Sequence, residues 1–500
     1  MPKRFLRICL LSGWFSLGTA FIPSVGLAAD DQKSPLMEPE FWKRQALADL
    51  IPYWDKHARD TEFGAFHMNL SRDWKPLPPW DKIPALVSRH VFGFSAAYML
   101  SGDDRYLEVA RRTAGYLLEH AWDSQHGGWF DRLARNGDVS VETKSVANQL
   151  YTNVGLTALY MAAGDTQVLS PVQKSIAIQR GRARDDRYGG YAQALNRDLS
   201  ALDDGKNKHA HFGYVGSLLL NLYLGTRDAA ILEWEKELMD LSLERMRDSE
   251  GWFHGWPDRF DRRWKLAPVF ADGKEVISVG AQLTAALALL RLYHQSGEAK
   301  YLESGRLLGD KLNRWGFDRG RGAWLDLLET KPPHGQVADP TIWWWVQIYG
   351  SFLQLQLYRL TNDPLYLENF RKSEEFFERS FRDRKMGGVN GSVGLDGRVK
   401  GEGRKASDSE WHTSYHEMEH ALLNYLYLNL YVHRKPAVLH FKLDGPGKHF
   451  VSLVDDPAVK IASVKMDGKP WTEFDASERS VSVPQGKGHS VEVTFAPGPR

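Results

Sequence analysis

Residues 416–420 read HEMEH, a pattern that places two histidines one helical turn apart with a glutamate between them. Such a pair can bind zinc while the glutamate acts as a base, as in metallopeptidases. His412, His416 and His420 form a stripe at intervals of four residues, so His416 and His420 could share a metal ion. The following stretch, ALLNYLYL (421–428), supplies no usual third ligand. We therefore expect no metal, and His416 is free to serve as a general base instead.

Other residues that could take part in chemistry lie in apolar stretches with helical spacing. The stretches are SRHVFGF (88–94), KSVANQLY (144–151), NKHAHFGY (207–214) and WWWVQIY (343–349). They contain the candidates Arg89, Asn148, His209, His211, Trp344, Trp345 and Gln347. Flat tryptophan rings suit the apolar face of a sugar. The HAH pair is a weak zinc signal, because residues two apart diverge on a helix.

A repeat along the chain predicts how these residues are brought together. Glycine-led turns recur at Gly64, Gly127, Gly189, Gly251, Gly322 and Gly387, at intervals of 62 to 71 residues. Each interval has room for two helices, and a glycine allows the positive φ that often follows a helix. The expected fold is an all-α (α/α)6 toroid of six helical hairpins over residues 36–434, with an open solenoid as the alternative. In a closed ring, the candidates would face one mouth of the barrel.

After about residue 434 the pattern changes. AVLHFKL (437–443), VKIASVKM (459–466) and HSVEVTFA (489–496) alternate apolar and polar residues and are separated by glycine-rich turns. This pattern is typical of short antiparallel strands. We predict a small β-rich module over residues 435–500 that packs against the toroid, with carbohydrate binding as the other possible role.

The first 29 residues predict export. Basic residues precede an apolar run that ends in small residues near Ala28 and Ala29, as in a cleavable signal peptide over residues 1–29. The single cysteine, Cys9, lies inside this segment, so the mature chain has no disulfide or cysteine-based zinc site. We expect a periplasmic enzyme that has no membrane contact after cleavage. A formal net charge of +1 gives no indication of nucleic-acid binding.

These features together resemble the N-acylglucosamine 2-epimerase family, which includes cellobiose 2-epimerases and mannose-type isomerases. The likeness covers about residues 38–433. RHVFGF (89–94) is similar to the family's R-x-x-W-x-F, NKHAH (207–211) to N-x-H-x-H, and WWVQ (344–347) to W-W-x-Q. ISVG (277–280) is similar to the approach to the eighth helix, and WHTSYH (411–416) to the segment whose last histidine is a catalytic base. The resemblance implies an (α/α)6 barrel that transfers a proton at sugar C2 without a cofactor.

The resemblance also implies roles for individual residues. His416 abstracts the C2 proton, and Arg89 stabilises the enediolate oxygen. His211 completes the expected catalytic set, and it is expected, like His209 and Gln347, to orient hydroxyls or assist ring opening. The expected substrate-binding residues are His209, Asn148, Tyr214, Trp344, Trp345, Gln347, Tyr349 and Trp411. The expected partner is a mono- or oligosaccharide, and the chain is expected to be a monomer or homodimer.

Three positions depart from the family pattern. Ala281 stands where the family has a second histidine, Tyr349 where it has a glutamate, and Tyr214 where it has a carboxylate. Epimerisation with two bases needs opposed acid–base groups, whereas an aldose–ketose isomerisation can use one. Tyr349 or Tyr214 could act as a weak acid, although a phenol with a pKa near 10 is poorly matched to this task.

Other functions fit the same scaffold. A glycoside hydrolase would need two carboxylates, and Asp203 or Asp204 could supply them. A polysaccharide lyase could use histidine and tyrosine, including Tyr214, Tyr349 or Tyr415. A non-catalytic carbohydrate-binding protein is the third alternative, because the second family histidine is absent.

Overall fold

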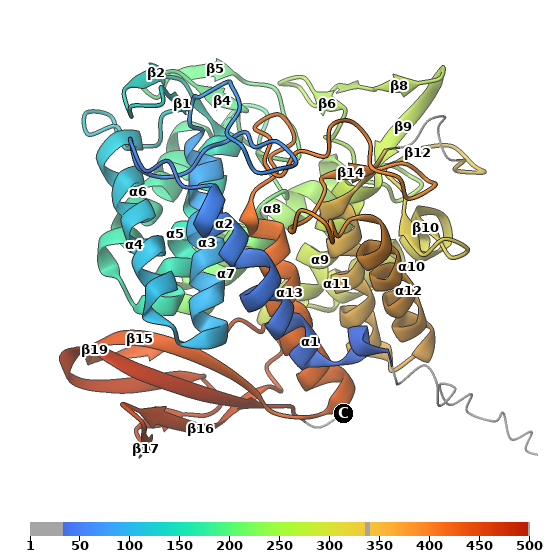
Figure 1. Cartoon of the computed structure of the whole chain (residues 1–500). Helices are drawn as coiled ribbons and strands as arrows, with labels where there is room; N and C mark the ends of the chain where they lie inside the picture. The colour runs from blue at the N-terminus through green and yellow to red at the C-terminus, as the bar shows by residue number, and fades with distance from the viewer. Residues whose placement is uncertain (1–33, 336–340, 499–500) are drawn as a thin grey trace, which may run out of the picture.

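The turns predicted from the glycine repeat are the points at which the chain folds back between helices. In the computed structural model, which describes residues 34–335 and 341–498, all six marked glycines have a positive φ between 76° and 87°. The predicted signal peptide lies outside the described residues. The expected helical fold with C-terminal strands is confirmed (Figure 1).

One set of helices lies on the inside of the molecule. These are α3 (Pro84–Ser101), α5 (Val146–Ala163), α7 (Leu220–Thr226, preceded by the π-helical turn η5, Val215–Leu219), α9 (Val279–Ser296), α11 (Trp344–Thr361) and α13 (Ser414–Tyr427). Each packs against the next in this order, with η5 making the contact to α9, and α13 packs against α3. The contacts between consecutive inner helices therefore form a closed circuit, in which the last helix touches the first.

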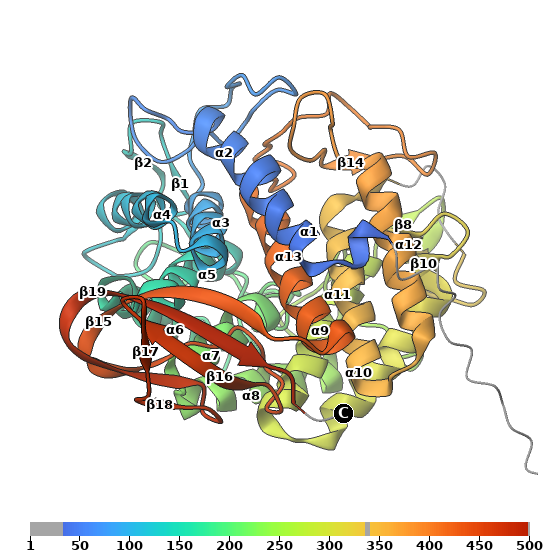
Figure 2. The ribbon, with the colours of Figure 1, turned by 60° about the horizontal axis from the view of Figure 1, so that its bottom comes forward.

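A second set covers the first from outside. It consists of α4 (Asp104–Tyr116), α6 (Thr166–Arg182), α8 (Ala229–Arg245), α10 (Ala299–Lys311) and α12 (Pro364–Ser380), each packed on the inner helix that precedes it. α1 (Pro39–Arg44) and α2 (Ile51–His57), joined by η3 (Gln45–Leu50), lie along α13 (Figure 2). Short helical turns complete the set: the 3₁₀ turn η2 (Pro35–Met37) and the π-helical turns η4 (Leu117–Ala121), η6 (Leu312–Gly316) and η7 (Leu428–His433).

The connection from an inner to an outer helix follows a local rule. The inner helix ends in a left-handed residue such as Gly102 or Gly164, and an aspartate such as Asp103 or Asp165 then caps the outer helix. The Asp103 side chain accepts the backbone N–H of Arg105 at 3.0 Å. The same order of residues stands in SGDD (101–104) and AGDT (163–166), so each stretch encodes a helix stop followed directly by a helix start.

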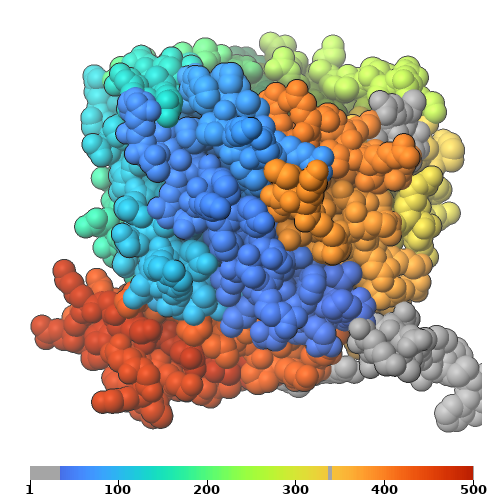
Figure 3. All heavy atoms as spheres, in the orientation of Figure 1, coloured from blue at the N-terminus to red at the C-terminus, as the bar shows by residue number. Residues whose placement is uncertain are grey.

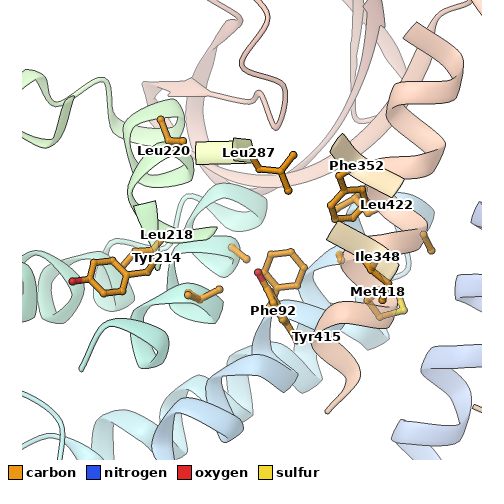
Figure 4. Close-up of a cluster of buried hydrophobic side chains, with 14 of the residues drawn as sticks. Phe92, Tyr214, Leu218, Leu220, Leu287, Ile348, Phe352, Tyr415, Met418 and Leu422 are labelled. Carbon is orange, nitrogen blue, oxygen red and sulfur yellow. The ribbon is translucent and has the colours of Figure 1, made fainter. Parts of the chain in front are cut away.

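The inner helices enclose an apolar core. Figure 4 shows Phe92, Leu287, Ile348, Phe352 and Leu422, from α3, α9, α11 and α13, pointing into a shared interior. Burial of these side chains holds the helices in place. Among the described residues, no helix is both long enough and apolar enough to span a membrane.

Short strands and loops lie at the end of the molecule where the inner helices begin (Figure 1). The strands are β1 (Arg132–Leu133), β2 (Val139–Val141), β3 (Lys144–Ser145), β4 (Ala194–Leu195), β5 (Ala201–Asp203), β6 (Arg259–Phe260), β7 (Leu266–Ala267), β8 (Phe270–Ala271), β9 (Lys274–Ser278), β10 (Phe317–Asp318), β11 (Ala323–Trp324), β12 (Leu327–Glu329), β13 (Ile342–Trp343) and β14 (Ser392–Val393). The loops of the first and last repeats meet where Leu70 N–H donates to the Ala406 carbonyl at 3.1 Å. In Figure 3, the blue N-terminal residues lie against the orange ones accordingly.

The C-terminal residues form an antiparallel sheet at the opposite end. β15 (Ala437–Phe450), β19 (Ser480–Ala496), β16 (Lys460–Met466) and β17 (Lys469–Trp471) lie in that order, and β18 (Phe474–Asp475) pairs with β19. β15 packs against α3, α5 and α7. The segment 451–456 is almost wholly buried, and its Asp455 forms an ion pair with Arg291 of α9 at 2.5 Å.

Candidate functional site

A cavity of about 380 Å³ lies among the N-terminal ends of the inner helices. Figure 1 shows that the C-terminal sheet covers the opposite end of these helices. The structure brings seven of the predicted site residues into the cavity wall: Arg89, His209, Trp344, Trp345, Tyr349, Trp411 and His416. They come from α3, α11, α13 and the segments that precede η5 and α13. Residues up to 327 positions apart in the sequence therefore share one surface, as expected if the repeat aligns equivalent helix starts.

His416 is the third residue of α13, a helix capped by Thr413. Its Nδ1 lies 3.2 Å from Oε2 of Glu419, and the Tyr415 hydroxyl donates to the other oxygen of the same carboxyl group at 2.9 Å. With Nδ1 occupied, Nε2 is the nitrogen left for another partner.

Burial acts in opposite directions on the two members of this pair. It lowers the pKa of His416 well below its usual value, and the charge of Arg89 lowers this pKa further. Burial also raises the pKa of Glu419 to about 7, against the opposing effect of the Tyr415 hydrogen bond. The imidazole is therefore neutral across the ordinary pH range, as a general base must be.

The histidine stripe that resembled a zinc motif is divided among three carboxylates. His412 Nε2 lies 3.2 Å from Glu417, whereas His420 Nε2 lies 2.8 Å from Glu374 on α12. His416 contacts Glu419, as described above. In the described part of the chain, no group of three or more His, Cys, Asp or Glu side chains gathers as a metal site would require. The two histidines of HEMEH thus bind different carboxylates, Glu419 and Glu374.

Arg89 lies on α3 and forms part of the cavity wall. Among the described residues, no carboxylate forms an ion pair with it. One guanidinium nitrogen donates to the Trp411 carbonyl at 2.6 Å, and the guanidinium lies 5.0–5.5 Å from the ring centres of Trp411, Tyr151 and Tyr415. Trp411 has a φ of 57°, a left-handed conformation that is unusual for a tryptophan. Aromatic faces and a carbonyl thus hold a buried cation that has no fixed counter-ion.

Two tryptophans at the start of α11 form the side of the cavity next to His416. The Trp345 ring stacks with the imidazole at a centroid distance of 6.3 Å, and the Trp344 ring lies at 6.0 Å from it. Gly280 allows this arrangement, because a Cβ there would come within 2.2 Å of the Trp345 ring. Tyr349 lies 5.5 Å from His416, and burial raises its pKa well above the usual value.

Gln347, predicted to bind substrate, is instead engaged with the backbone. Its side-chain oxygen accepts the Trp324 N–H at 2.8 Å, and its nitrogen donates to the Trp324 carbonyl at 2.8 Å. Gln149 binds Trp129 in the same way, and Gln282 binds Phe253. Each glutamine hydrogen-bonds the backbone N–H and carbonyl of an aromatic residue in the glycine turn that precedes its helix. These bonds fix the turn to the inner helix.

His211, Asn148 and Tyr214 also lie outside the cavity wall. His211 Nδ1 donates to the Asn207 carbonyl at 2.7 Å, and its Nε2 accepts the Tyr191 N–H at 3.3 Å. Asn148 bridges the backbone of Ala85 and Phe130.

Tyr214 is fully buried, and in Figure 4 its hydroxyl points away from Phe92 and Tyr415. Burial raises the pKa of this hydroxyl well above its usual value. Helical spacing alone did not separate these core-facing positions from the cavity-facing ones.

Sequence reasoning missed Lys208, which also lines the cavity. The residue is 5% exposed, and its ammonium lies 5.5 Å from the Trp345 ring centre and 5.9 Å from that of Trp256. Burial lowers the pKa of Lys208 to about 8, with a smaller effect from Arg89. Neighbouring His209 has a pKa lowered to about 3, again mainly by burial. The available signal was a lysine placed inside NKHAH, between two residues already singled out.

Comparison with known proteins gives a consistent set of likenesses. The model of the family N-acylglucosamine 2-epimerase (GlcNAc 2-epimerase) matches residues 64–416. A cellobiose 2-epimerase from Bacteroides fragilis is 24% identical over 386 residues, which cover 75% of this chain and 95% of the relative.

Solved structures share the fold. A cellobiose 2-epimerase from Spirochaeta thermophila superimposes with a TM-score of 0.68 at 21% identity, covering 78% of this chain and 96% of that one. A D-mannose isomerase superimposes with a TM-score of 0.68 at 19% identity, covering 80% and 99%. At such identities these structures establish likeness of fold alone.

Proposed function

Because the chain belongs to the N-acylglucosamine 2-epimerase family, we propose that it transfers a proton at C2 of an open-chain aldose, as an aldose–ketose isomerase or a 2-epimerase. The cellobiose 2-epimerases and D-mannose isomerase that it resembles are named for reactions of this kind. The observation that carries the proposal is the meeting of His416 and Arg89 in one tryptophan-lined cavity. We take the ring of inner-helix contacts to be the (α/α)6 toroid expected from the repeat.

In this proposal, His416 is the base. Its Nε2 takes the proton from C2, while Glu419 accepts the hydrogen bond from Nδ1–H and stabilises the imidazolium that forms. The rings of Trp344 and Trp345 next to the imidazole suit the apolar face of a sugar. The sugar would thereby be held with C2 towards the base.

Arg89 is the group that stabilises the negative charge. Removal of the C2 proton places charge on the carbonyl oxygen at C1, and this charge develops only along the reaction. A buried guanidinium without a carboxylate partner is available for that oxygen, and an interaction that strengthens with the reaction lowers the barrier.

The proton then returns to the sugar. Delivery to C1 by the same His416, with transfer of a hydroxyl proton from O2 to O1, gives the ketose, whereas delivery to the other face of C2 gives the epimer. Ala281 is fully buried, and the cavity residue contributed by α9 within the described chain is Thr284. Since neither can transfer a proton as histidine does, we favour the aldose–ketose reaction on one face.

Hydrolysis of a glycosidic bond fits the cavity less well. It would use two carboxylates placed across the bond. Of the described residues that line the cavity, Glu410 carries the one carboxylate. Asp203 and Asp204 pair with Arg259 and Arg262.

We further propose that the protein works in the periplasm, because its first 29 residues have the pattern of a signal peptide.

Exchange with solvent deuterium tests the reaction. The mature protein is incubated in deuterated water with glucose, mannose, fructose and cellobiose, and the position of deuterium is followed by NMR. We expect label at C1 or C2, together with ketose or epimer. His416→Ala should lower the rate by about 10²- to 10⁴-fold, the usual contribution of a general base.

His126→Ala serves as the matched control, because this histidine lies in a loop outside the cavity wall. Its rate should equal that of the unchanged protein. An absence of label with every sugar, or full exchange in a folded His416→Ala protein, would refute the proposal. An unsaturated product from a uronate polymer would point instead to a lyase.

A further inference from the structure

Lys208 is held so that its side chain enters the cavity. Its backbone N–H donates to the Gly255 carbonyl at 2.9 Å, and its own carbonyl accepts the Gly213 N–H at 2.9 Å. These bonds fix the chain on both sides of the residue. The ammonium lies over the rings of Trp256 and Trp345, between the 44% exposed Trp256 and the wall beside His416.

The other buried lysines of residues 34–335 and 341–498 have carboxylate partners. Lys82, Lys144, Lys206 and Lys405 pair with Asp60, Asp123, Asp185 and Asp383 respectively, at 2.9–3.1 Å. Lys206 is only two residues from Lys208, yet the two side chains have different surroundings. Within the described chain, Lys208 is the buried lysine whose side chain forms no hydrogen bond or ion pair. Burial of an unpaired charge is unfavourable, so an unpaired ammonium in a ligand cavity indicates that a bound ligand supplies the partner.

The cavity thus holds two buried cations that lack a carboxylate partner. Arg89 contacts Tyr151, Trp411 and Tyr415, whereas Lys208 contacts a different pair of rings, so the two cations occupy different parts of the wall. The proposed reaction develops one negative charge, and Arg89 accounts for it. Glu410 also lines the cavity, but it forms no ion pair with Lys208 and borders a neighbouring cavity as well. The charge of Lys208 is left without a role in the reaction.

We propose that the cavity accepts an acidic sugar, an aldose that carries a carboxylate at the end remote from its carbonyl, and that Lys208 binds this carboxylate. The ammonium would form a charge-assisted hydrogen bond, and the flanking tryptophans would keep water from weakening it. The inference deepens the proposed function and rests on it for the assignment of a sugar to this cavity. It assigns Lys208 to specificity rather than to proton transfer.

Binding of inert open-chain analogues tests this assignment. L-gulonate and D-glucitol are the reduced forms of glucuronate and glucose, and D-mannonate and D-mannitol form the corresponding pair for mannuronate and mannose. These compounds lack a carbonyl group and cannot react, so their affinities are independent of catalysis. Isothermal titration calorimetry of the full mature protein at pH 7 should give at least about tenfold tighter binding for an acid than for its alditol, the size expected of one buried charge-assisted hydrogen bond.

Variants identify the residue responsible. Lys208→Gln should remove the preference for the acid while leaving alditol affinity within about threefold, and Lys208→Arg should retain much of the preference. Lys469→Gln, at an exposed position in the C-terminal sheet, should leave it unchanged. Lys208→Gln should not lower the unfolding midpoint, because it removes an unpaired charge, whereas Lys206→Gln should lower it by breaking a buried ion pair.

Equal affinities for acid and alditol in both pairs would overturn the inference, as would an acid preference that persists in Lys208→Gln. Loss of deuterium exchange on neutral aldoses in Lys208→Gln, without any acid preference in the unchanged protein, would overturn it in favour of a proton-transfer role. Failure of the proposed reaction has a different signature: acid preference would remain while no sugar exchanges deuterium.

Discussion

The imidazole of His416 and the carboxyl group of Glu419 form a hydrogen-bonded pair whose protonation controls the base. With the pKa of His416 far below neutrality and that of Glu419 near 7, the group that titrates close to physiological pH is the carboxyl. Below pH 7 it is protonated and accepts the Nδ1–H only weakly. Above pH 7 it is ionised, and an ionised acceptor makes Nε2 a stronger base. The apparent pKa belongs to the pair.

We therefore predict that kcat/KM for the sugar rises as pH increases through about 7. Glu419→Gln should remove this limb of the profile and lower the plateau by about tenfold or more, because a neutral amide stabilises the imidazolium less well. Measurement of kcat/KM from pH 5 to 9 for both proteins tests this. Glu402→Gln, an exposed position, should keep the limb. A rising limb of unchanged midpoint in Glu419→Gln would assign the titration to another group.

Sequence reasoning found part of this site for a clear reason. His416 and Arg89 stand in dense motifs, and both line the cavity. Asn148 and Gln347 stand in equally suggestive motifs but face the backbone of neighbouring segments. Adjacent helical residues point about 100° apart, so an error of one position in the helix phase exchanges a cavity residue for a packing residue. Lys208 was not predicted, because the sequence does not show that a lysine side chain lacks a partner in the fold.

At the scale of elements, the glycine turns do more than reverse the chain. A glutamine on the following inner helix bonds both the N–H and the carbonyl of the aromatic residue in the turn, as in Gln149 with Trp129. The sequence predicted the turns from glycine and spacing, and their positive φ values confirm this. The sequence did not predict these glutamine–backbone hydrogen bonds, because the partners lie 20 to 29 residues apart and one of them is a backbone segment.

Gln149→Leu should therefore be strongly destabilising, although leucine has a similar volume. It would leave a buried N–H and carbonyl of Trp129 without partners, at a cost of about 1–3 kcal/mol each. The thermal unfolding midpoint should fall by several degrees. Gln125→Leu, at an exposed position of the neighbouring loop, should have little effect. Equal midpoints for the two variants would mean that water satisfies the backbone groups as well as the glutamine does.

At the scale of the whole molecule, the two ends of the helical body have different tasks. The helix starts and their loops build the cavity, while the C-terminal sheet covers the other end (Figure 2). The sheet is tied to the helices by charge as well as by packing. Asp455 binds Arg291 at 2.5 Å, and Asp456 binds Arg359 at 2.7 Å. Strand alternation predicted a sheet but not these ion pairs, because Asp455 and Asp456 lie between strands and their partners are more than 90 residues away.

This division predicts that stability and catalysis respond separately to changes at the sheet. Asp455→Ala would leave the Arg291 guanidinium, only 13% exposed, without its counter-ion. Asp455 is what raises the pKa of Arg291 above its usual value, against the effect of burial. Removal of one partner from a buried ion pair typically costs about 3–5 kcal/mol, so the unfolding midpoint should fall markedly. At 25 °C and pH 9, kcat/KM per folded molecule should stay within about twofold of the unchanged protein, because the cavity beside His416 lies at the other end of the inner helices. The rising limb of the pH profile should move to lower pH, because Arg291 lines a small cavity with Glu419 and its charge, once freed of Asp455, lowers the pKa of that carboxyl group further. Glu473→Ala, at an exposed position in the loop between β17 and β18, should alter neither quantity. A large fall in kcat/KM in a folded Asp455→Ala protein would show instead that the sheet acts on the cavity through α9, on which both Arg291 and Thr284 lie.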